Sequence, residues 1–401
     1  MPVKEKKSGG AKRELFTRNF LLISVINLTV FFGYQMTAIG LPVYAATLGA
    51  GAQVVGLVTT LVTVSALIVR AFSGALLDRF GRKGSLIAGI ALMLCTTVAY
   101  AVFPIVGVIL GLRLLHGIGW GPGSTTTNTI AADIIPKPRF AEGMGYFAMT
   151  TAVAIALAPA LSIQLVQGSG ALYMIVVSAA CTAVALVLSF FQSDPANKTV
   201  EEHEEQDGSY ATSGIDHFVE RRALLPSAIM FLVNMGFGCI VTFIALHAQE
   251  QGVENISLYF LVYAIVTIVS RPGIGKLIDR YGYRVPGILS TLCTSATLVM
   301  IGLSDSLWMF ALAGVLAGLG LGTAGGTFQA MAVAASKPWR RGVATSTYLT
   351  AFDLGIAMGS LVGGIIATSF GYSVMYLAIA FFPLAGCIVS AFAVRGAVSK
   401  R

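Results

Sequence analysis

The segment VRAFSGALLDRFGRKGS, residues 69–85, and the segment SRPGIGKLIDRYGYRVP, residues 270–286, carry one pattern twice in the same chain. Each segment follows a long apolar run and precedes another. At an offset of 201 residues the identical positions pair as Arg70 with Arg271, Gly74 with Gly275, Leu76 with Leu277, Asp78 with Asp279, Arg79 with Arg280 and Gly81 with Gly282. A motif repeated at one fixed offset indicates a chain built from two similar halves.

The composition is strongly apolar. Of 401 residues, 56% are hydrophobic and 11% are charged, whereas soluble domains are roughly 25% charged. A helix needs about 20 apolar residues to cross a bilayer core of ~30 Å. The apolar runs therefore predict twelve transmembrane helices, at about 20–42, 54–77, 85–103, 105–132, 143–166, 172–192, 224–247, 257–278, 285–304, 307–333, 343–369 and 374–395.

Basic residues are unevenly distributed along the chain. The formal net charge is +8, and the 26 Lys and Arg residues gather at the two ends and in every second connection between apolar runs. Cytoplasmic loops of membrane proteins carry such an excess of basic residues. The pattern predicts that both termini face the cytoplasm, and it explains the positive charge without a nucleic-acid partner. The compact loops favour a bacterial inner membrane.

One long polar segment, QSDPANKTVEEHEEQDGSYATSGIDHFVERR, interrupts the apolar runs. It is acidic and lacks apolar periodicity, which is typical of a flexible linker. The predicted fold is an all-α membrane protein, with twelve transmembrane helices in two pseudo-symmetric six-helix bundles that face the lipid bilayer. The predicted parts are a cytoplasmic tail at 1–19, a bundle at 20–192, a cytoplasmic linker at 193–223, a bundle at 224–395 and a cytoplasmic tail at 396–401.

Three stretches carry a family resemblance. GALLDRFGRK, residues 74–83, resembles the signature loop between spans two and three of the major facilitator superfamily. RLLHGIGWG, residues 113–121, resembles the span-four signature of its proton-driven antiporters, and AIALAPALS, residues 154–162, resembles their span-five signature with alanines where glycines are usual. With the topology, these motifs cover essentially the whole chain. The resemblance implies alternating access, in the branch of drug and metabolite antiporters driven by protons.

In the resembled family the loop between spans two and three latches the two halves on the cytoplasmic side in the outward-facing state. Asp133, at the inner end of span four, is the expected partner of Arg79. The alternative is positive-inside anchoring of a tight turn, which would not need Asp and Gly at repeated spacing. The predicted cytoplasmic latch comprises Gly74, Asp78, Arg79, Gly81, Arg82, Lys83, Asp133, Gly275, Asp279, Arg280, Gly282 and Arg284.

Asp353 is the acid that lies deepest in a predicted span. It is about eleven residues into span eleven, or ~16 Å at about 1.5 Å per residue, close to the membrane midplane. Ionisable groups at this depth are expensive and are functional candidates by default. We expect Asp353 to carry the coupling proton. The alternatives are a carboxylate held by an arginine or by helix backbones, and a direct substrate contact.

Arg113 lies about eight residues into span four and cannot readily lose its charge. The resemblance implies a role in proton coupling or substrate binding, and a structural bundle contact is the alternative. His116 follows one turn later and can titrate near neutral pH, so it joins the proton-coupling candidates, with a simple hydrogen bond as the alternative. Arg70 and Arg271 could snorkel to the cytoplasmic surface or line the inner vestibule.

In the resembled fold, spans one, four, seven and ten line the transport pathway. Their amide and aromatic residues, with one amide from span five, suit a moderately amphipathic organic solute. An interhelical hydrogen bond is the alternative role of each amide. The predicted substrate cavity comprises Asn27, Tyr34, Gln35, Arg113, Gln164, Asn234, Phe243 and Gln329.

These features predict a secondary active transporter that exports a small organic compound against proton entry. A proton-coupled importer or facilitator of an organic anion or sugar, with Arg113 in the substrate site, is the main alternative, and a transporter-like sensor without net transport is a third. No cluster of nucleophile, base and orienting group is present, so an enzyme is disfavoured. The cysteines show no metal-ligand spacing, and the glycine-rich stretches lack a phosphate-binding lysine. We therefore expect no metal, no cofactor, the proton gradient as energy source, and a monomer.

Overall fold

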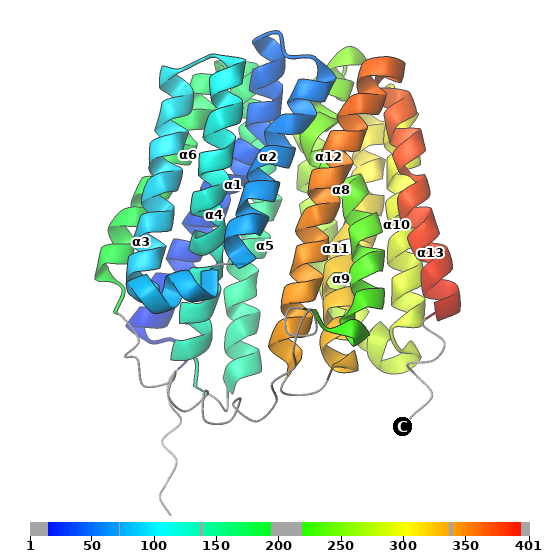
Figure 1. Cartoon of the computed structure of the whole chain (residues 1–401). Coiled ribbons are helices and arrows are strands. Elements are labelled where there is room, and N and C mark those ends of the chain that lie inside the picture. Colours follow the sequence, from blue (N-terminus) through cyan, green and yellow to red (C-terminus); the bar gives the residue numbers. More distant parts are fainter. Residues whose placement is uncertain (1–14, 72, 137–138, 194–218, 337–339, 394–401) are drawn as a thin grey trace, which may run out of the picture.

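The computed structural model describes residues 15–71, 73–136, 139–193, 219–336 and 340–393. These ranges are helical with short connections and contain no β-strand. Figure 1 shows the long helices side by side, with the start of α1 and the end of α13 at one end of the bundle, here the termini end; the opposite end is the far end. The helices are α1 (Arg18–Thr47), α2 (Ala52–Ala71), α3 (Ser73–Val102), α4 (Val106–Ile134), α5 (Phe140–Gln164), α6 (Ala171–Phe191), α8 (Leu224–Glu250), α9 (Ser257–Tyr281), α10 (Arg284–Gly302), α11 (Leu307–Ala335), α12 (Arg341–Ile379) and α13 (Phe381–Ala393), with a π-helical turn η2 (Leu165–Ser169) and a 3₁₀ turn η4 (Arg221–Ala223).

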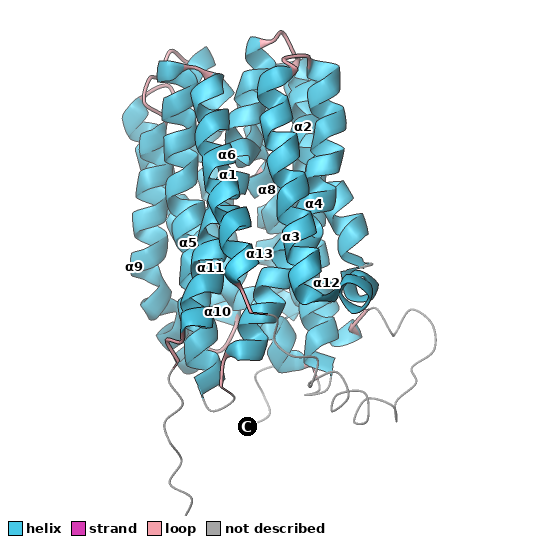
Figure 2. Cartoon of the chain, turned by 90° about the vertical axis from the view of Figure 1, so that its left-hand side faces the viewer, coloured by secondary structure: helices cyan, strands magenta, loops and turns pink. Residues whose placement is uncertain are grey.

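Within the described ranges, nine segments are long and apolar enough to cross a membrane, judged by length and composition. The last of them, Val343–Ala393, has 51 residues, more than twice what one crossing needs. The all-helical membrane fold expected from the apolar runs is thus confirmed, and the number of twelve spans stays a prediction. Figure 2, turned by 90°, shows the short described loops at the far end.

Four glycines with left-handed backbone conformation divide the helices at matching places. Gly81 (φ 70°, ψ 166°) interrupts α3, and Gly282 (φ 66°, ψ −167°) follows the end of α9. Gly170 (φ 102°, ψ 156°) precedes α6, and Gly371 (φ 81°, ψ 168°) interrupts α12. Both pairs have the 201-residue offset of the repeated motif. The repeat is therefore a repeat of backbone structure, and glycine suits these positions because other residues rarely adopt positive φ.

The apolar interior consists of three clusters of buried side chains. Two belong to helices α1–α6, one around Trp120 and Phe147 and the other around Met36 and Tyr100. The third is formed mainly by helices α8–α13, around Phe310, and also takes up Ile39, Val43, Val55 and Ile163 from the first half. The exact domain boundaries at 192/193 and 223/224 stay predictions.

The two halves contact each other through α1 with α8, α2 with α12 and α5 with α9. At the beginning of α2, the backbone N–H of Gln53 donates to Thr368 Oγ1 of α12 (3.0 Å). Gly56 faces the carbonyl of Ser360 so closely that an added Cβ would lie 2.4 Å from its oxygen. These residues belong to the first turns of α2 and the later turns of α12, which lie towards the far end (Figure 1). The halves are therefore in close contact at the far end.

Candidate transport site

A cavity of about 580 Å³ lies among the helices of the second half. Its lining comes from α8, α9, α11 and α12, with Ile155 of α5 contributed by the first half. The lining is mostly apolar and includes the rings of Phe237 and Tyr263. Ile274 and Ile278, in the last turns of α9, carry the lining towards the termini end. A cavity of this size can hold a small organic molecule, and it lies on the termini side of the close contact between the halves.

Few polar groups line the cavity. Asn234 donates its amide N–H to the carbonyl of Phe352 (3.1 Å), and the Tyr348 hydroxyl donates to the carbonyl of Gly325 (2.8 Å). The hydroxyl of Thr267 is buried without a hydrogen-bond partner in the described part of the chain, and Gln329 is exposed. The polar atoms left for a solute therefore come chiefly from an amide and a hydroxyl, which suits an uncharged polar group on an apolar molecule.

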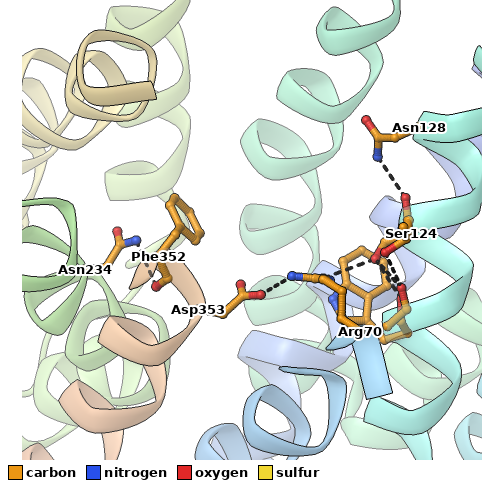
Figure 3. Close-up of polar contacts among 9 residues, drawn as sticks. Arg70, Ser124, Asn128, Asn234, Phe352 and Asp353 are labelled. Atoms are coloured by element: carbon orange, nitrogen blue, oxygen red, sulfur yellow. Dashed lines mark hydrogen bonds and ion pairs between the residues drawn. The ribbon is translucent and has the colours of Figure 1, made fainter. Parts of the chain in front are cut away.

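Arg70 of α2 and Asp353 of α12 form an ion pair between the two halves. The guanidinium of Arg70 also donates to Ser124 Oγ of α4 (3.3 Å). Figure 3 shows Arg70 and Asp353 pointing towards each other, while the neighbouring Phe352 carbonyl points the other way, to Asn234 of the cavity wall. The sequence left open whether Arg70 snorkels outward, and in the structure it points inward. The two side chains are 23% and 18% exposed, so water can reach them.

The chemistry of this pair links protonation to the contact between the halves. Removing one partner of a largely buried ion pair costs about 3–5 kcal/mol, because the other charge is left without a counterion. A proton on the Asp353 carboxyl removes the negative charge without any change of sequence, so Arg70 loses its counterion in the other half. The pair can therefore convert the binding of one proton into a weaker connection between α2 and α12.

Arg113 and His116 of α4 lie in a separate, closed cluster. Arg113 is fully buried, and its Nε donates to the Val58 carbonyl of α2 (2.9 Å) and its Nη2 to the Thr37 carbonyl of α1 (3.4 Å). The ring of His116 lies 6.0 Å from the ring of Tyr100. Neither Arg113 nor His116 is among the residues that line the cavity. Arg113 thus connects α1, α2 and α4 within the first half.

Some of the predicted cavity residues line the observed cavity and others lie elsewhere in the bundle. Asn234 and Gln329 line the cavity. Asn27 lies instead between α1, α4 and α5, where its amide donates to Thr150 Oγ1 (2.9 Å) and accepts from Thr127 (3.0 Å). These bonds are of the interhelical kind that the sequence offered as the alternative role of each amide.

The other predicted cavity residues have different surroundings in the bundle. The ring of Tyr34 is stacked on Trp120, with centroids 3.8 Å apart. Phe243 belongs to the core of the second half, Gln35 is half-buried, and Gln164 is exposed where α5 meets η2. The residue types were visible in the sequence, whereas the face of each helix that meets the cavity depends on its neighbours.

In the cytoplasmic latch, Asp133 of α4 pairs with Arg82 of α3. The expected pairing of Asp133 with Arg79 stays a prediction, because the side chain of Arg79 lies outside the described ones. Gly81 redirects the chain just before Arg82, which then begins the stretch of α3 that packs on α4. Lys83 Nζ donates to the Phe190 carbonyl of α6 (2.8 Å), so these contacts lie within the first half. The side chains of five predicted latch residues lie outside the described ones: Gly74, Asp78, Arg79, Gly275 and Asp279.

In the second copy of the motif, three latch residues are described. The Arg280 guanidinium lies 5.1 Å from the centroid of the Tyr281 ring, and Gly282 takes the positive φ noted above. Arg284 is the first residue of α10. These positions define the turn between α9 and α10 at the termini end.

Sequence reasoning missed an ion pair at the entry to α8. Arg340, the residue before α12, pairs with Glu220, and its Nη2 donates to the Val219 carbonyl (3.1 Å). Burial of Glu220 disfavours its charge, but the hydrogen bond and charge of Arg340 and the backbone N–H of Arg222 outweigh burial and hold the pKa of this carboxyl below its usual value. Glu220 looked like part of a solvated acidic linker, and no sequence signal marked it.

Comparison with known proteins agrees with this architecture. The family model of the Major Facilitator Superfamily matches residues 23–289 and 227–401. The chain belongs to this superfamily. The Staphylopine export protein of Staphylococcus aureus is 20% identical over 366 residues, which cover 89% of this chain and 91% of that protein. An uncharacterised MFS-type transporter of Burkholderia pseudomallei is 27% identical over 402 residues, covering 94% and 93%.

A solved structure of the nucleoside transporter NupG matches this fold with a TM-score of 0.74 and 14% identity, over 94% of this chain and 100% of that one. An identity this low supports the shared fold alone. The Major Facilitator Superfamily assignment confirms the resemblance found in the sequence motifs, and it confirms that the chain is a multi-pass membrane transporter of small solutes and not an enzyme.

Proposed function

We propose that this transporter exports a small amphipathic organic solute across a bacterial inner membrane by alternating access, driven by proton entry. The observation that carries the proposal is the ion pair of Arg70 and Asp353, because it joins the two halves and depends on the charge of one carboxylate. Basic residues gather at the termini end, so we assign this end to the cytoplasm. The cavity then faces the cytoplasm in the present conformation.

Protonation of Asp353 is the step that couples proton entry to solute export. A proton removes the carboxylate charge that holds Arg70, and the halves become free to close at the termini end and open at the far end. Loss of the proton restores the pair and the present conformation. Each ligand shifts the equilibrium between the two conformations according to the difference in its affinity for them. A proton and a solute that favour opposite conformations are therefore exchanged across the membrane.

Arg113 and His116 remain proton-coupling candidates through Tyr34. The Tyr34 hydroxyl lies within electrostatic reach of both Arg113 and Asp353, so it stands between the closed cluster and the ion pair. In the first half, Tyr34 and Gln35 are the residues we expect to meet the solute once the cavity closes around it.

The solute is proposed to bind in the cavity of the second half. Its apolar walls would take the hydrophobic part of the molecule, and Asn234, Thr267 and Gln329 would orient its polar group. Export as the direction is supported by the name of one relative, the Staphylopine export protein, and by the span-four motif. The cytoplasmic latch would hold the termini end closed when the far end is open.

The experiment uses purified protein in liposomes that contain a pH-sensitive dye. An imposed proton gradient and a panel of amphipathic solutes would produce solute-dependent proton flux in the wild type, and this flux is expected to be lost in Asp353→Asn. Asp305→Asn, the same change on an exposed loop between α10 and α11, is the matched control and is expected to keep the flux. Intact coupled flux in Asp353→Asn would remove this carboxylate from the mechanism.

A facilitator or importer of an organic anion is the second candidate. It is favoured by the charges deep in the described helices, where two guanidinium groups, those of Arg70 and Arg113, accompany the carboxylate of Asp353, which pairs with Arg70. In the same liposomes, a facilitator would transport an anionic solute at a rate that does not depend on the imposed proton gradient. An importer would transport the anionic solute in the same direction as the protons. Such a result would overturn proton-driven export and leave the fold assignment untouched.

A further inference from the structure

Two glycines of α11 leave part of the cavity wall without side chains. Gly325 and Gly326 both line the cavity, and an added Cβ at either position would meet no atom within 4 Å. Gly322, one turn earlier, differs, because an added Cβ there would lie 2.3 Å from Thr267 Oγ1 of α9. Close packing of two helices therefore explains Gly322 and leaves the other two unexplained. We call Gly325 and Gly326 the glycine face.

The first half shows what occupies the matching place in its own bundle. Three lining positions of α11 have counterparts in α4 at the offset of 201 residues, Leu321 with Trp120, Gly325 with Ser124 and Gly326 with Thr125. The ring of Trp120 is stacked on Tyr34, with centroids 3.8 Å apart and an angle of 5° between the planes. The first half thus places a flat ring of its own at this level. In the second half, smaller residues stand there and the cavity remains.

The other walls of the cavity also suit a flat, uncharged ring. They include the rings of Phe237, Tyr263 and Phe352, and none of the lining residues is an acid, a lysine or an arginine. Contacts between aromatic rings stabilise a complex beyond the effect of the buried area alone. A charged group would lose its hydration in this lining without gaining a counterion. The lining therefore favours an aromatic solute without charge.

Asn234 supplies a second observation that is independent of the glycine face. It lines the cavity and is 1% exposed, and its amide N–H donates to the Phe352 carbonyl (3.1 Å; Figure 3). Its amide oxygen accepts no hydrogen bond from a residue in the described part of the chain. A buried acceptor without a donor is unfavourable, so this oxygen suits a solute that brings an N–H or O–H group.

We propose that the cavity selects an uncharged solute with a flat aromatic ring and one N–H or O–H donor. The ring lies against the glycine face, in the place that corresponds to Trp120 in the first half, and the donor binds the Asn234 oxygen. Gly325 and Gly326 are then specificity-determining residues, because a side chain at either position would take the space of the ring. This inference rests on the proposed function of the cavity as the solute site, but not on the direction or coupling of transport.

The test compares three probes on the purified full-length protein in detergent at pH 7. Naphthamide has a flat, uncharged ring system and an N–H donor. Its fully saturated analogue keeps the amide on a thicker, non-aromatic frame, and naphthoate keeps the flat ring and carries a negative charge. A ligand that binds the folded state raises the melting temperature in a saturable way, and the concentration dependence gives its affinity.

Naphthamide is expected to bind about 3-fold to 10-fold more tightly than its saturated analogue, because only the flat ring stacks on the lining. Hydrophobicity alone predicts the opposite order, since the saturated analogue is the more apolar of the two. Naphthoate is expected to bind about 10-fold or more weakly than naphthamide, because its charge has no counterion in the lining.

Gly326→Val is expected to weaken naphthamide binding by about 10-fold or more, since the valine side chain occupies the space of the ring. Gly111→Val is the matched control. Gly111 lies in α4 outside the cavity lining and also has open space around an added Cβ, so this change is expected to leave the affinity unchanged. Both variants are expected to fold, because neither side chain meets another atom in the structure.

The outcomes separate this proposal from the proposed function. Equal affinity for naphthamide and its saturated analogue, tighter binding of naphthoate, absence of saturation with naphthamide, or unchanged affinity in Gly326→Val overturns the proposal. No proton gradient is present in this measurement. Loss of proton-driven flux in liposomes together with the expected binding would therefore remove coupled export and keep the aromatic site, whereas coupled flux of other solutes without this binding would remove the aromatic site alone.

Discussion

At Glu220 burial and electrostatics act in opposite directions on one side chain. Burial favours the neutral acid, while Arg340 and the backbone N–H of Arg222 favour the carboxylate, and the pKa of Glu220 is lowered as the net result. A group with a lower pKa in the folded chain stabilises the fold above its ordinary pKa. This contribution is lost as the pH falls through the folded-state value. Glu220 thus fastens the chain entering α8 to the start of α12 in a pH-dependent way.

Glu220→Gln is therefore expected to lower the melting temperature at pH 7, where the carboxylate is charged in both states. The difference from the wild type is expected to shrink as the pH falls from about 4, the ordinary pKa of a glutamate, through the lowered folded-state pKa, because below that value both proteins carry a neutral group there. Melting curves between pH 3 and pH 7 check this. Glu254→Gln, at an exposed acid, is the control and is expected to show no such trend. A difference that stays constant over this range would contradict the role assigned to the charge.

Single residues also mark how far the site could be predicted. Asp353 was identified from its depth in an apolar run, but its partner Arg70 lies 283 residues away in the other half. The sequence indicates how deep each charged residue lies in its span. It does not indicate how the two halves are arranged, and this arrangement brings the two charges together. Tyr100 was not identified at all, because a tyrosine near the end of an apolar run is indistinguishable from any other core residue until its ring is seen 6.0 Å from the ring of His116.

At the level of helices, the repeated motif is a turn as much as a charge pattern. Gly81 and Gly282 hold matching positions in the two copies and share positive φ. The turn divides α3 in the first half and leads from α9 into α10 in the second. Sequence analysis identified these glycines as latch residues, and the structure adds the backbone reason for glycine at both positions.

Gly81→Ala and Gly282→Ala are each expected to destabilise the protein by about 1–3 kcal/mol, because the combination of positive φ and extended ψ at these positions is essentially restricted to glycine. Gly107→Ala is the matched control. Gly107 lies inside α4 with open space around an added Cβ, so this change is expected to be neutral or to stabilise by up to about 1 kcal/mol. Melting temperatures of the three purified variants check the prediction. Equal effects at all three positions would contradict the strain argument.

The helices themselves were predictable because their apolar runs are long. The predicted spans at 224–247 and 307–333 fall within α8 and α11, whose observed bounds are a few residues longer. The expected boundary between the last two spans coincides with the turn at Gly371 inside α12. The rotation of each helix about its axis was not predictable, and this rotation explains why Asn234 faces the cavity while Asn27 faces a neighbouring helix.

For the whole molecule, the close contact between halves at the far end defines the present conformation. Gly56 of α2 lies against the backbone of Ser360 in α12, where no side chain can move aside. A larger residue at position 56 must push α2 away from α12. Alternating access then implies a shift towards the conformation that is open at the far end.

Gly56→Val is expected to open the far end, whereas Gly51→Val, with open space around its Cβ, is the matched control. The measurement is the distance between spin labels at positions 103 and 305, in the loops after α3 and α10, in a protein whose five cysteines have been replaced. A longer distance is expected in Gly56→Val alone. The same distance distribution in both variants would show that this contact does not hold the far end closed.

The Arg70–Asp353 pair has a consequence for the energy source. The pair is electrically neutral when formed, and the protein carries one additional positive charge when Asp353 holds a proton. A charge that crosses the membrane potential is worth about 2.3 kcal/mol per 100 mV. Reorientation of the proposed proton-loaded carrier would therefore respond to voltage, and an uncharged solute would be driven by the membrane potential even where the pH is equal on the two sides.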